Sequence, residues 1–415
     1  MPLTLKQKLY KFLRYSEKWT GTDMVYLAKG GFWLTGSKVI NSAVAFGLAI
    51  AYANLLSQET YGQYKYILSI ASLVGITALT GMDTSLVRSI IKGYEGSLKN
   101  VIKLRIKWGF WGMFIGFAIS AYYFINENNI MAASIFIAAI LSPLINAIVY
   151  NPYFEGKKLF KTLSKYSAIN QVFVAILIIG SLIIFPNIIF LIFIYFFSNF
   201  LIQLILLIRT YKKYKPNDKI DPDTISFGKH LSAMNILSLV ANQFDKILTW
   251  HFLGPIQLAI YSFATIPATQ IQSLLKPLSI MAFPKISEQD IETTKKTLPK
   301  KVLKFWGFLI LIIIVYILLS PIFYKLFFRE YTDAIKYSWL FSLSLFSFPM
   351  RLFSYPLIAH AKHKDLYITN LINPVTKIIF LSIFLPLYGI WGAIFAILSA
   401  TLISDAFLYY KFTKI

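Results

Sequence analysis

The sequence predicts an all-α membrane protein that crosses the bilayer many times, and three observations carry this prediction. Apolar residues make up 57% of the 415 residues and charged residues only 14%, against about 25% charged residues in a typical soluble domain. The mean hydropathy is +0.62. The apolar residues form runs long enough to cross a bilayer as helices. Lipid must cover this surface, which excludes a disordered chain, a soluble enzyme and a secreted disulfide scaffold.

Twelve apolar runs are each long enough for one spanning helix of about 20 residues. Two pairs of runs are separated only by short turns, at 186–187 and 386–388. A merged pair would be about twice as long as a bilayer accommodates, so we expect two antiparallel helices in each case. The predicted spans are 32–56, 61–82, 106–125, 131–150, 166–185, 188–208, 231–253, 258–281, 303–324, 336–358, 366–385 and 389–410.

The basic residues alternate between the two sides of the membrane, loop by loop. Of the 41 Lys and Arg, 32 fall on the side of the termini and three fall on the other side, all in one loop. Positively charged loops stay in the cytoplasm, so we expect both termini there. Residues 1–31 are predicted to form a cytoplasmic amphipathic segment on the membrane surface. The net charge of +23 is then explained by topology and anionic lipid, and not by nucleic acid.

A weak internal repeat divides the spans into two sets of six. Residues 56–64 align with residues 253–261, and both segments join an outward helix to an inward one. Repeats in the same orientation are related by an axis along the membrane normal. The sequence therefore predicts an N-terminal six-helix lobe over 32–208, a cytoplasmic linker over 209–230 and a C-terminal six-helix lobe over 231–415. A central cavity is expected between the lobes.

The segments outside the membrane carry little chemistry. The outer loops are too short to hold the acceptor-binding domain of a sugar polymerase or a lipid-linked glycosyltransferase. The cytoplasmic loops contain no GxxxxGK[ST] phosphate-binding motif. The four histidines lack metal-ligand spacing, and the absence of cysteine excludes thiolate sites and cysteine nucleophiles. We therefore expect no catalytic residues, no metal and no cofactor, in a protein that moves a substrate across the bilayer.

Polar residues recur at helical spacing within the spans of the C-terminal lobe. In the seventh span they follow steps of three and four residues, which places them on one helix face. Hydrogen bonding between helices is the ordinary reason for such a stripe. Four spans carry a stripe, however, and each stripe includes an ionisable residue, which favours a water-filled cavity. The predicted cavity-lining residues are Asn235, Ser238, Asn242, Thr269, Gln272 and Asn370.

Six cations lie inside the predicted spans. Four of them are about 9–12 Å from the nearer span end, where facing lipid would cost about 2.5–3.5 kcal/mol each. These four are Lys38, Lys246, Arg351 and Lys377. Lys65 and Lys276 lie closer to a span end, where extending the side chain to the membrane surface is an equal alternative to a cavity position.

The acidic residues inside the spans are fewer than the cations. Asp245 and Asp405 are candidate proton or sodium sites, or else partners that neutralise a nearby cation. Asp245 could pair with Lys246, but adjacent residues on a helix do not face each other, so we expect Asp245 to act separately. A cavity with excess cations favours an anionic substrate, and phosphate or diphosphate fits the chemistry of Lys and Arg.

Three segments of the chain resemble a known family. They are LTGMDTSLVRS (79–89), NQFDKILTWHFLGPIQLAIYSFA (242–264) and LPLYGIWGAIFAILSATLISDA (385–406). They resemble the polysaccharide (O-antigen type) lipid-linked oligosaccharide flippases of the multidrug/oligosaccharidyl-lipid/polysaccharide exporter superfamily. The resemblance extends over nearly the whole chain in span number, length and six-plus-six layout. It implies two six-helix bundles in a V, an alternating-access cycle, the bacterial cytoplasmic (inner) membrane and an undecaprenyl-diphosphate-linked oligosaccharide as substrate.

The resemblance also implies roles for individual residues. Coupling-ion sites in the superfamily involve spans seven, eleven and twelve, which match Asp245, Asn373 and Asp405 here, with H⁺ or Na⁺ as the ion. The excess of cations over acids inside the spans separately indicates Lys38, Lys246, Arg351 and Lys377 as the residues that bind the diphosphate, with Lys276 and Lys65 as further candidates. Related lipid II flippases have two further helices, which argues against that subgroup. We expect a monomer, with other polysaccharide assembly proteins as candidate partners. A cation-coupled multidrug or small-molecule exporter of the same superfamily is the alternative.

Overall fold

The computed structural model describes residues 14–15, 24–287, 290–359 and 363–415. This part of the chain is helical almost throughout and contains no strand. The prediction of an all-α fold is therefore confirmed. Most of the predicted amphipathic segment 1–31 lies outside the described residues, and the first long helix already begins at Met24.

From residue 24 to residue 214 the N-terminal half forms six long helices and two short ones. The predicted turn at 186–187 is confirmed, since two helices end and begin on either side of it. Asn187 caps the second of these helices, because its side chain accepts a hydrogen bond from the Ile189 amide at 2.8 Å. The helices are α2 Met24–Leu55, α3 Gln58–Ile76, α4 Met82–Ile91, α5 Ser97–Ile125, α6 Asn129–Ala147, α7 Asn151–Gly156, α8 Phe160–Ile184 and α9 Ile188–Tyr214.

The C-terminal half contains two very long helices that are bent at a glycine. Gly254 and Gly389 have φ values of 82° and 59°, which a residue without Cβ adopts at no steric cost. Each glycine lies between two predicted spans, so each long helix has two arms. The elements are α10 Asp223–Ser287, α11 Ile291–Phe327, η1 Arg329–Tyr331, α12 Ala334–Ser342, η2 Leu343–Phe346, α13 Ser347–Met350, η3 Arg351–Phe353, α14 Ser354–Ala359 and α15 His363–Thr413.

Eight helices among the described residues are long and apolar enough to cross a membrane. Two of the eight are α10 and α15, which each contain a bend. The predicted second span corresponds to α3, and the predicted tenth span corresponds to the irregular run from α12 to α14; neither is among the eight. The chain is therefore a multi-pass membrane protein, while the count of twelve spans stays a prediction.

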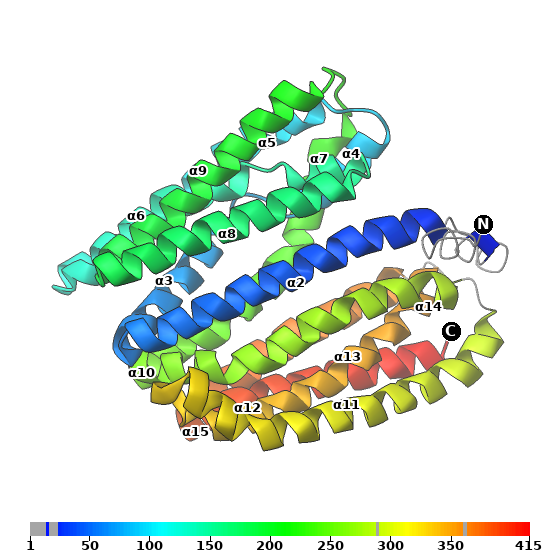
Figure 1. The fold of residues 1–415 in the computed structure, drawn as a ribbon. Helices are drawn as coiled ribbons and strands as arrows, with labels where there is room; N and C mark the ends of the chain where they lie inside the picture. Colours follow the sequence, from blue (N-terminus) through cyan, green and yellow to red (C-terminus); the bar gives the residue numbers. More distant parts are fainter. Residues whose placement is uncertain (1–13, 16–23, 288–289, 360–362) are drawn as a thin grey trace, which may run out of the picture.

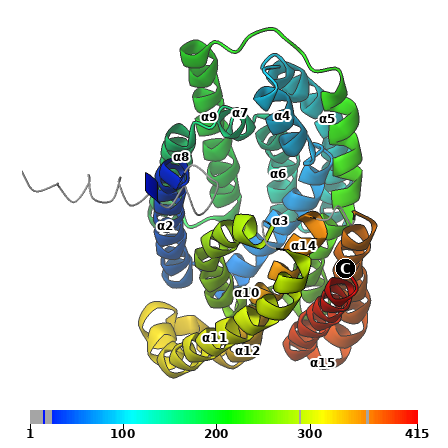
Figure 2. The same cartoon turned by 90° about the vertical axis from the view of Figure 1, so that its right-hand side faces the viewer.

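The long helices form two bundles (Figure 1). One bundle contains α5, α6, α8 and α9, and the other contains α11 to α15. The bundles are closest at the end where α10 bends, and they spread toward the end that carries the C-terminus. Figure 2 shows the second bundle beneath the first, with α3 and α10 between them. The arrangement is the V that the sequence resemblance implies.

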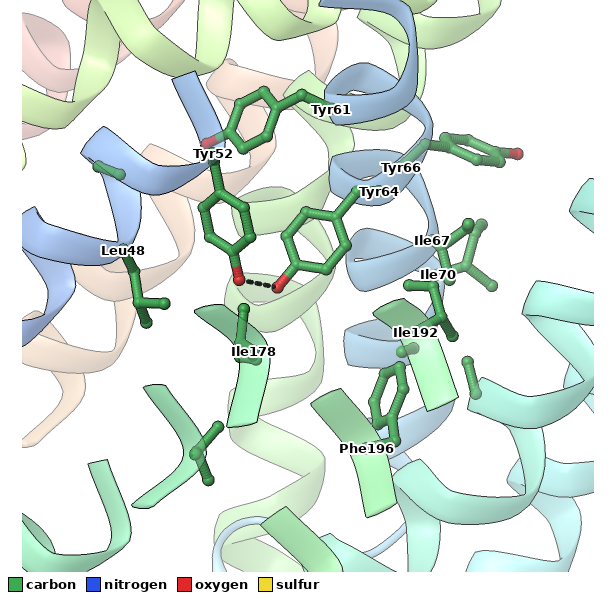
Figure 3. Close-up of a cluster of buried hydrophobic side chains, with 14 of the residues drawn as sticks. Leu48, Tyr52, Tyr61, Tyr64, Tyr66, Ile67, Ile70, Ile178, Ile192 and Phe196 are labelled. Carbon is green, nitrogen blue, oxygen red and sulfur yellow. Dashed lines mark hydrogen bonds between the residues drawn. The ribbon is translucent and has the colours of Figure 1, made fainter. Parts of the chain in front are cut away.

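At the narrow end of the V, the two bundles pack through aromatic rings and through a main-chain contact at a glycine. A Cβ added to Gly62 would lie 1.9 Å from the Pro255 carbonyl oxygen, so α3 and the bend of α10 touch through their main chains. Tyr61 is 2% exposed and lies 4.8 Å, centroid to centroid, from Phe263 of α10. Figure 3 shows Tyr61 above Tyr52 and Tyr64, whose hydroxyls share a hydrogen bond, within a cluster of buried side chains. This junction joins the two bundles.

The connection between the two halves is short and fixed to the N-terminal half. α9 ends at Tyr214 and α10 begins at Asp223, so the predicted linker 209–230 includes two helix ends around a coil over 215–222. Ser89 of α4 donates a hydrogen bond to Asp221 at 2.9 Å. Ser85 of α4 donates to the Thr224 carbonyl at 2.6 Å. The first turns of α10 are therefore held against α4.

Candidate functional site

Asp245 lies at the centre of a group of polar side chains inside the membrane-spanning part of the molecule. It is 7% exposed. Its Oδ2 accepts a hydrogen bond from the Tyr261 hydroxyl at 2.5 Å. Its Oδ1 is 4.0 Å from the Nζ atoms of both Lys246 and Lys377. No hydrogen-bond donor reaches Oδ1 among the described residues. One carboxylate therefore faces two ammonium groups and one phenol.

The bend at Gly254 explains how Tyr261 reaches Asp245. Asp245 precedes Gly254 by nine residues and Tyr261 follows it by seven, so the two arms of α10 place both side chains at nearly the same depth. Lys377 comes from α15, which packs along α10. Tyr261 was not predicted as a site residue, because it is one residue away from the polar stripe of its span. Counting residues on either side of the turn between the two spans places Tyr261 and Asp245 at similar depths, and this signal could have identified Tyr261.

Lys246 is closer to Asp245 than the sequence predicts. Neighbouring residues on a helix point about 100° apart, so separate action was expected. The lysine side chain is long enough to fold back, and its ammonium group lies 4.0 Å from Oδ1 of Asp245. The same Nζ donates to the Asn242 carbonyl and to Oε1 of Gln243, both at 3.2 Å. The expectation that Asp245 acts separately from Lys246 is therefore wrong.

Lys65 joins this group from the N-terminal half. It lies on α3, with its Nζ 5.5 Å from the centre of the Tyr61 ring. It is also within electrostatic reach of Lys246. We call Lys65, Asp245, Lys246, Tyr261 and Lys377 the Asp245 cluster. It brings together side chains from three helices. Two of its three ammonium groups, those of Lys246 and Lys377, lie 4.0 Å from the carboxylate, and the third, that of Lys65, lies on the side of Lys246.

A second pair of opposite charges lies elsewhere in the C-terminal half. Arg351 is exposed in η3, a 3₁₀ turn that interrupts the predicted tenth span. It is within electrostatic reach of Asp405. Lys38 on α2 and Lys276 on α10 are exposed. Within the described chain, none of the contacts of Lys38, Lys276 or Arg351 joins them to the Asp245 cluster.

The remaining predicted site residues lie along α10 and α15. Ser238 and Gln272 are half-buried, and Gln272 donates to Ser344 of η2 at 3.4 Å. Asn373 donates to Thr401 at 3.5 Å, which joins the two arms of α15 and leaves Asn373 outside the Asp245 cluster. The exposed residues of the set are Asn235, Asn242, Thr269 and Asn370.

A further buried charge was missed by the sequence analysis. Arg105 stands just before the predicted third span, 106–125, but α5 begins at Ser97, so Arg105 lies inside the helix and is 2% exposed. It pairs with Asp83 at 3.0 Å. A cavity of about 140 Å³ opens beside this pair, lined also by Asn146 and Gln203. Among the described residues, no group of three His, Asp or Glu side chains could hold a metal ion.

Comparison with known proteins identifies the family and the fold. Residues 27–290 match the model of the family described as polysaccharide biosynthesis protein. No curated protein matches the chain. An inward-facing multidrug resistance MATE family transporter of the MOP superfamily superimposes with a TM-score of 0.68 at 12% identity, over 90% of this chain and 95% of that chain.

Two other solved structures share the fold. The lipid II flippase MurJ, in its inward closed conformation, gives a TM-score of 0.62 at 15% identity, over 92% of this chain and 87% of that chain. A MOP superfamily transporter from Pyrococcus furiosus gives 0.57 at 14% identity, over 93% and 96%. The family match covers more than half of the chain. The chain therefore belongs to the polysaccharide biosynthesis protein family and has the fold of the MOP superfamily transporters.

Proposed function

We propose that the chain translocates an undecaprenyl-diphosphate-linked oligosaccharide across the bacterial cytoplasmic membrane by alternating access. The family and the fold are those of a membrane transporter or flippase and not of an enzyme. The observation that carries the proposal is the charge of the Asp245 cluster. The cluster contains three ammonium groups and one carboxylate, which two of them face at 4.0 Å, so a positive excess remains within the cluster.

A positive excess inside a membrane protein needs an anion, because an uncompensated charge away from water is costly. Lys and Arg bind phosphate groups through charge-assisted hydrogen bonds. In the proposed cycle the diphosphate lies at Lys246 and Lys377, and Lys65 approaches it from the other bundle. The exposed asparagines of α10 and α15 would contact the sugars, and the polyprenyl tail would stay in lipid between the bundles.

The remaining features of the proposal follow the sequence. Both termini lie in the cytoplasm, as the distribution of basic residues favours. The chain acts as a monomer beside other polysaccharide assembly proteins, with an O-antigen type glycan as substrate. H⁺ or Na⁺ drives the cycle. Two ammonium groups at 4.0 Å from Asp245 would repel Na⁺. Asp405 has one cation, Arg351, within electrostatic reach, so Asp405 is the better candidate for the coupling site.

The test uses the purified full chain in proteoliposomes with a fluorescent, short-chain polyprenyl-diphosphate glycan. Lys246→Gln and Lys377→Gln should each slow translocation by at least about tenfold, since each removes a charge worth more than ~1.4 kcal/mol to an anion held nearby. Lys325→Gln is the matched control, because Lys325 is an exposed lysine at the last turn of α11. Wild-type rates in both cluster variants would rule out the proposed site.

The likeness to a multidrug resistance transporter supports a second candidate, a cation-coupled exporter of small molecules. The two candidates differ in the charge of the substrate. A positive cluster repels cationic drugs, whereas it attracts a diphosphate. A deletion strain that becomes sensitive to cationic drugs while it still exports its surface glycan would favour the exporter.

A further inference from the structure

We propose that Asp245 is an internal substitute for the anion of the substrate, which holds Lys246 and Lys377 in the empty protein and competes with the diphosphate for them. This inference rests on the proposed function and names the residue that sets affinity and release. The carboxylate is 7% exposed, and it lies between two ammonium groups that would otherwise repel each other across α10 and α15.

The geometry shows that the two lysines are attracted but not fully paired. Both Nζ atoms are 4.0 Å from the same atom, Oδ1 of Asp245, beyond the distance of an ordinary N–H···O hydrogen bond. Oδ1 is buried and accepts no hydrogen bond. Lys246 gives its hydrogen bonds to Asn242 and Gln243 instead. Each ammonium group therefore keeps donors that an incoming phosphate oxygen can take.

Tyr261 limits how strongly Asp245 holds the lysines. Its hydroxyl donates to Oδ2 at 2.5 Å, so one of the two carboxylate oxygens is already occupied by a neutral donor. A hydrogen bond to a charged acceptor stabilises the charge, and it leaves less attraction for the ammonium groups. Tyr261 is thus a positioning residue, which acts on the substrate site through Asp245.

The charges of the cluster balance when the substrate is present. A diphosphate esterified at both ends keeps one ionised oxygen on each phosphorus. Together with Asp245 these oxygens match the three ammonium groups of Lys65, Lys246 and Lys377. Without Asp245 the bound state would keep an excess cation, and the diphosphate would be held more tightly. A transporter must release what it binds, so a competing anion inside the site favours turnover.

The test measures binding of inorganic pyrophosphate to the purified full chain in nanodiscs by calorimetry. Asp245→Asn should bind pyrophosphate about tenfold more tightly than wild type, because it removes a negative charge about 4 Å from two cations. Tyr261→Phe should bind pyrophosphate several-fold more weakly. Without the hydrogen bond from Tyr261, both oxygens of Asp245 can attract the two lysines, so Asp245 competes more strongly with pyrophosphate. Asp245→Glu keeps the charge and should remain near the wild-type affinity.

The two substitutions shift affinity in opposite directions, which a purely structural role would not produce. In proteoliposomes Asp245→Asn should also translocate more slowly at saturating substrate, since release is impaired. Unchanged or weaker pyrophosphate binding in Asp245→Asn, beside normal binding in wild type, would overturn this inference alone. No binding in either protein would overturn the proposed function as well. If Asp245→Asn fails to fold, the Tyr261→Phe variant serves as the test. Unchanged or tighter pyrophosphate binding by Tyr261→Phe would refute the proposed competition between Asp245 and the diphosphate.

Discussion

Arg105 illustrates at the scale of a single residue how the fold holds a charge inside a membrane protein. Its guanidinium group donates to the carbonyl oxygens of Asn146 at 3.0 Å and Leu79 at 3.1 Å, and it pairs with Asp83 at 3.0 Å. Leu79 has a φ of 57°, a left-handed conformation that costs a non-glycine residue energy. The planar guanidinium group of Arg105 therefore stabilises the strained turn between α3 and α4 by hydrogen bonding to the carbonyl oxygen of Leu79.

Arg105→Lys should lower the stability of the purified protein by about 1–3 kcal/mol, because one ammonium group cannot reach all these acceptors. The matched control is Arg88→Lys. Arg88 is exposed and lies 4.8 Å from the centre of the Phe227 ring, where lysine can take its place. Thermal unfolding in detergent would show the difference, and equal midpoints for the two variants would contradict this role of Arg105.

The candidate site could be predicted from the sequence only in part. Hydropathy identified the unusual cations, since a lysine within an apolar run stands out, and three of the six form the Asp245 cluster. The pairing of Asp245 with Lys246 was predicted wrongly, because helix geometry describes Cβ directions and not where a four-carbon side chain ends. Tyr261 was missed because it lies beside the polar stripe of its span and not on it. Tyrosine is also common in this chain, with 26 copies, so its presence in a span gives no signal.

At the scale of elements, the connection between the halves depends on Asp221. Burial acts to raise the pKa of Asp221, but hydrogen bonds from the Asp223 amide and Ser89, and the Lys92 ammonium at 3.7 Å, hold it below its ordinary value. A lowered carboxyl pKa contributes stability above the ordinary value and loses it as the pH falls. The docking of the coil over 215–222 should therefore persist from neutral pH down to about pH 4 and be lost below it.

A spin label on Ile220→Cys tests this prediction, since Ile220 is 49% exposed and the chain has no other cysteine. The label should stay immobile between pH 7 and pH 5 and become mobile under more acidic conditions. In an Asp221→Asn background it should be more mobile at every pH. Release of the label already near pH 6 in the otherwise unmodified chain would contradict the role assigned to Asp221.

The junction of α3 and α10 makes a second prediction at this scale. Gly62→Ala would place a methyl group 1.9 Å from the Pro255 carbonyl oxygen, and separating the two backbones should cost about 1–3 kcal/mol or more. Gly47→Ala is the matched control, because a Cβ on Gly47 of α2 meets nothing within 4 Å. It should be neutral, or stabilising by up to about 1 kcal/mol. Equal thermal midpoints would refute the close contact.

The helices were easier to predict than their ends. Apolar runs located the spans, but α5 starts at Ser97, nine residues before the predicted span, and α9 continues to Tyr214, six residues beyond its span. These extensions are polar, so hydropathy gives no signal for them. The buried Ser97 and Thr210 show that contacts with neighbouring elements hold them.

At the scale of the whole molecule, the contacts indicate which parts move together. The first arm of α10 is held to α4 at several points, including the Gly81 amide, which donates to Ser232 at 3.0 Å. The bend that follows this arm touches Gly62 of α3 through Pro255. We therefore expect residues 223–253 to move with the N-terminal bundle, although the sequence repeat assigns most of them to the C-terminal lobe.

Spin-label distances in this cysteine-free chain can test that expectation. Labels at Lys99 and Ser226, both exposed, should give one narrow distance distribution throughout the cycle. Labels at Ser226 and Thr413 should give a broad or double distribution, because the two bundles change their separation. The reverse result, with the first pair broad and the second narrow, would place the arm with the C-terminal bundle.

The contact between Gly62 and Pro255 also has a mechanical consequence. It places the axis about which the two bundles can tilt at one end of the molecule. α3, with 19 residues, extends about 28 Å from this axis. A tilt of about 10° around this axis moves the far end of α3 by about 5 Å. The two bundles can therefore separate widely at the open end of the V while the residues at the Gly62–Pro255 contact hardly move. The tyrosine packing at this contact can stay intact throughout the cycle.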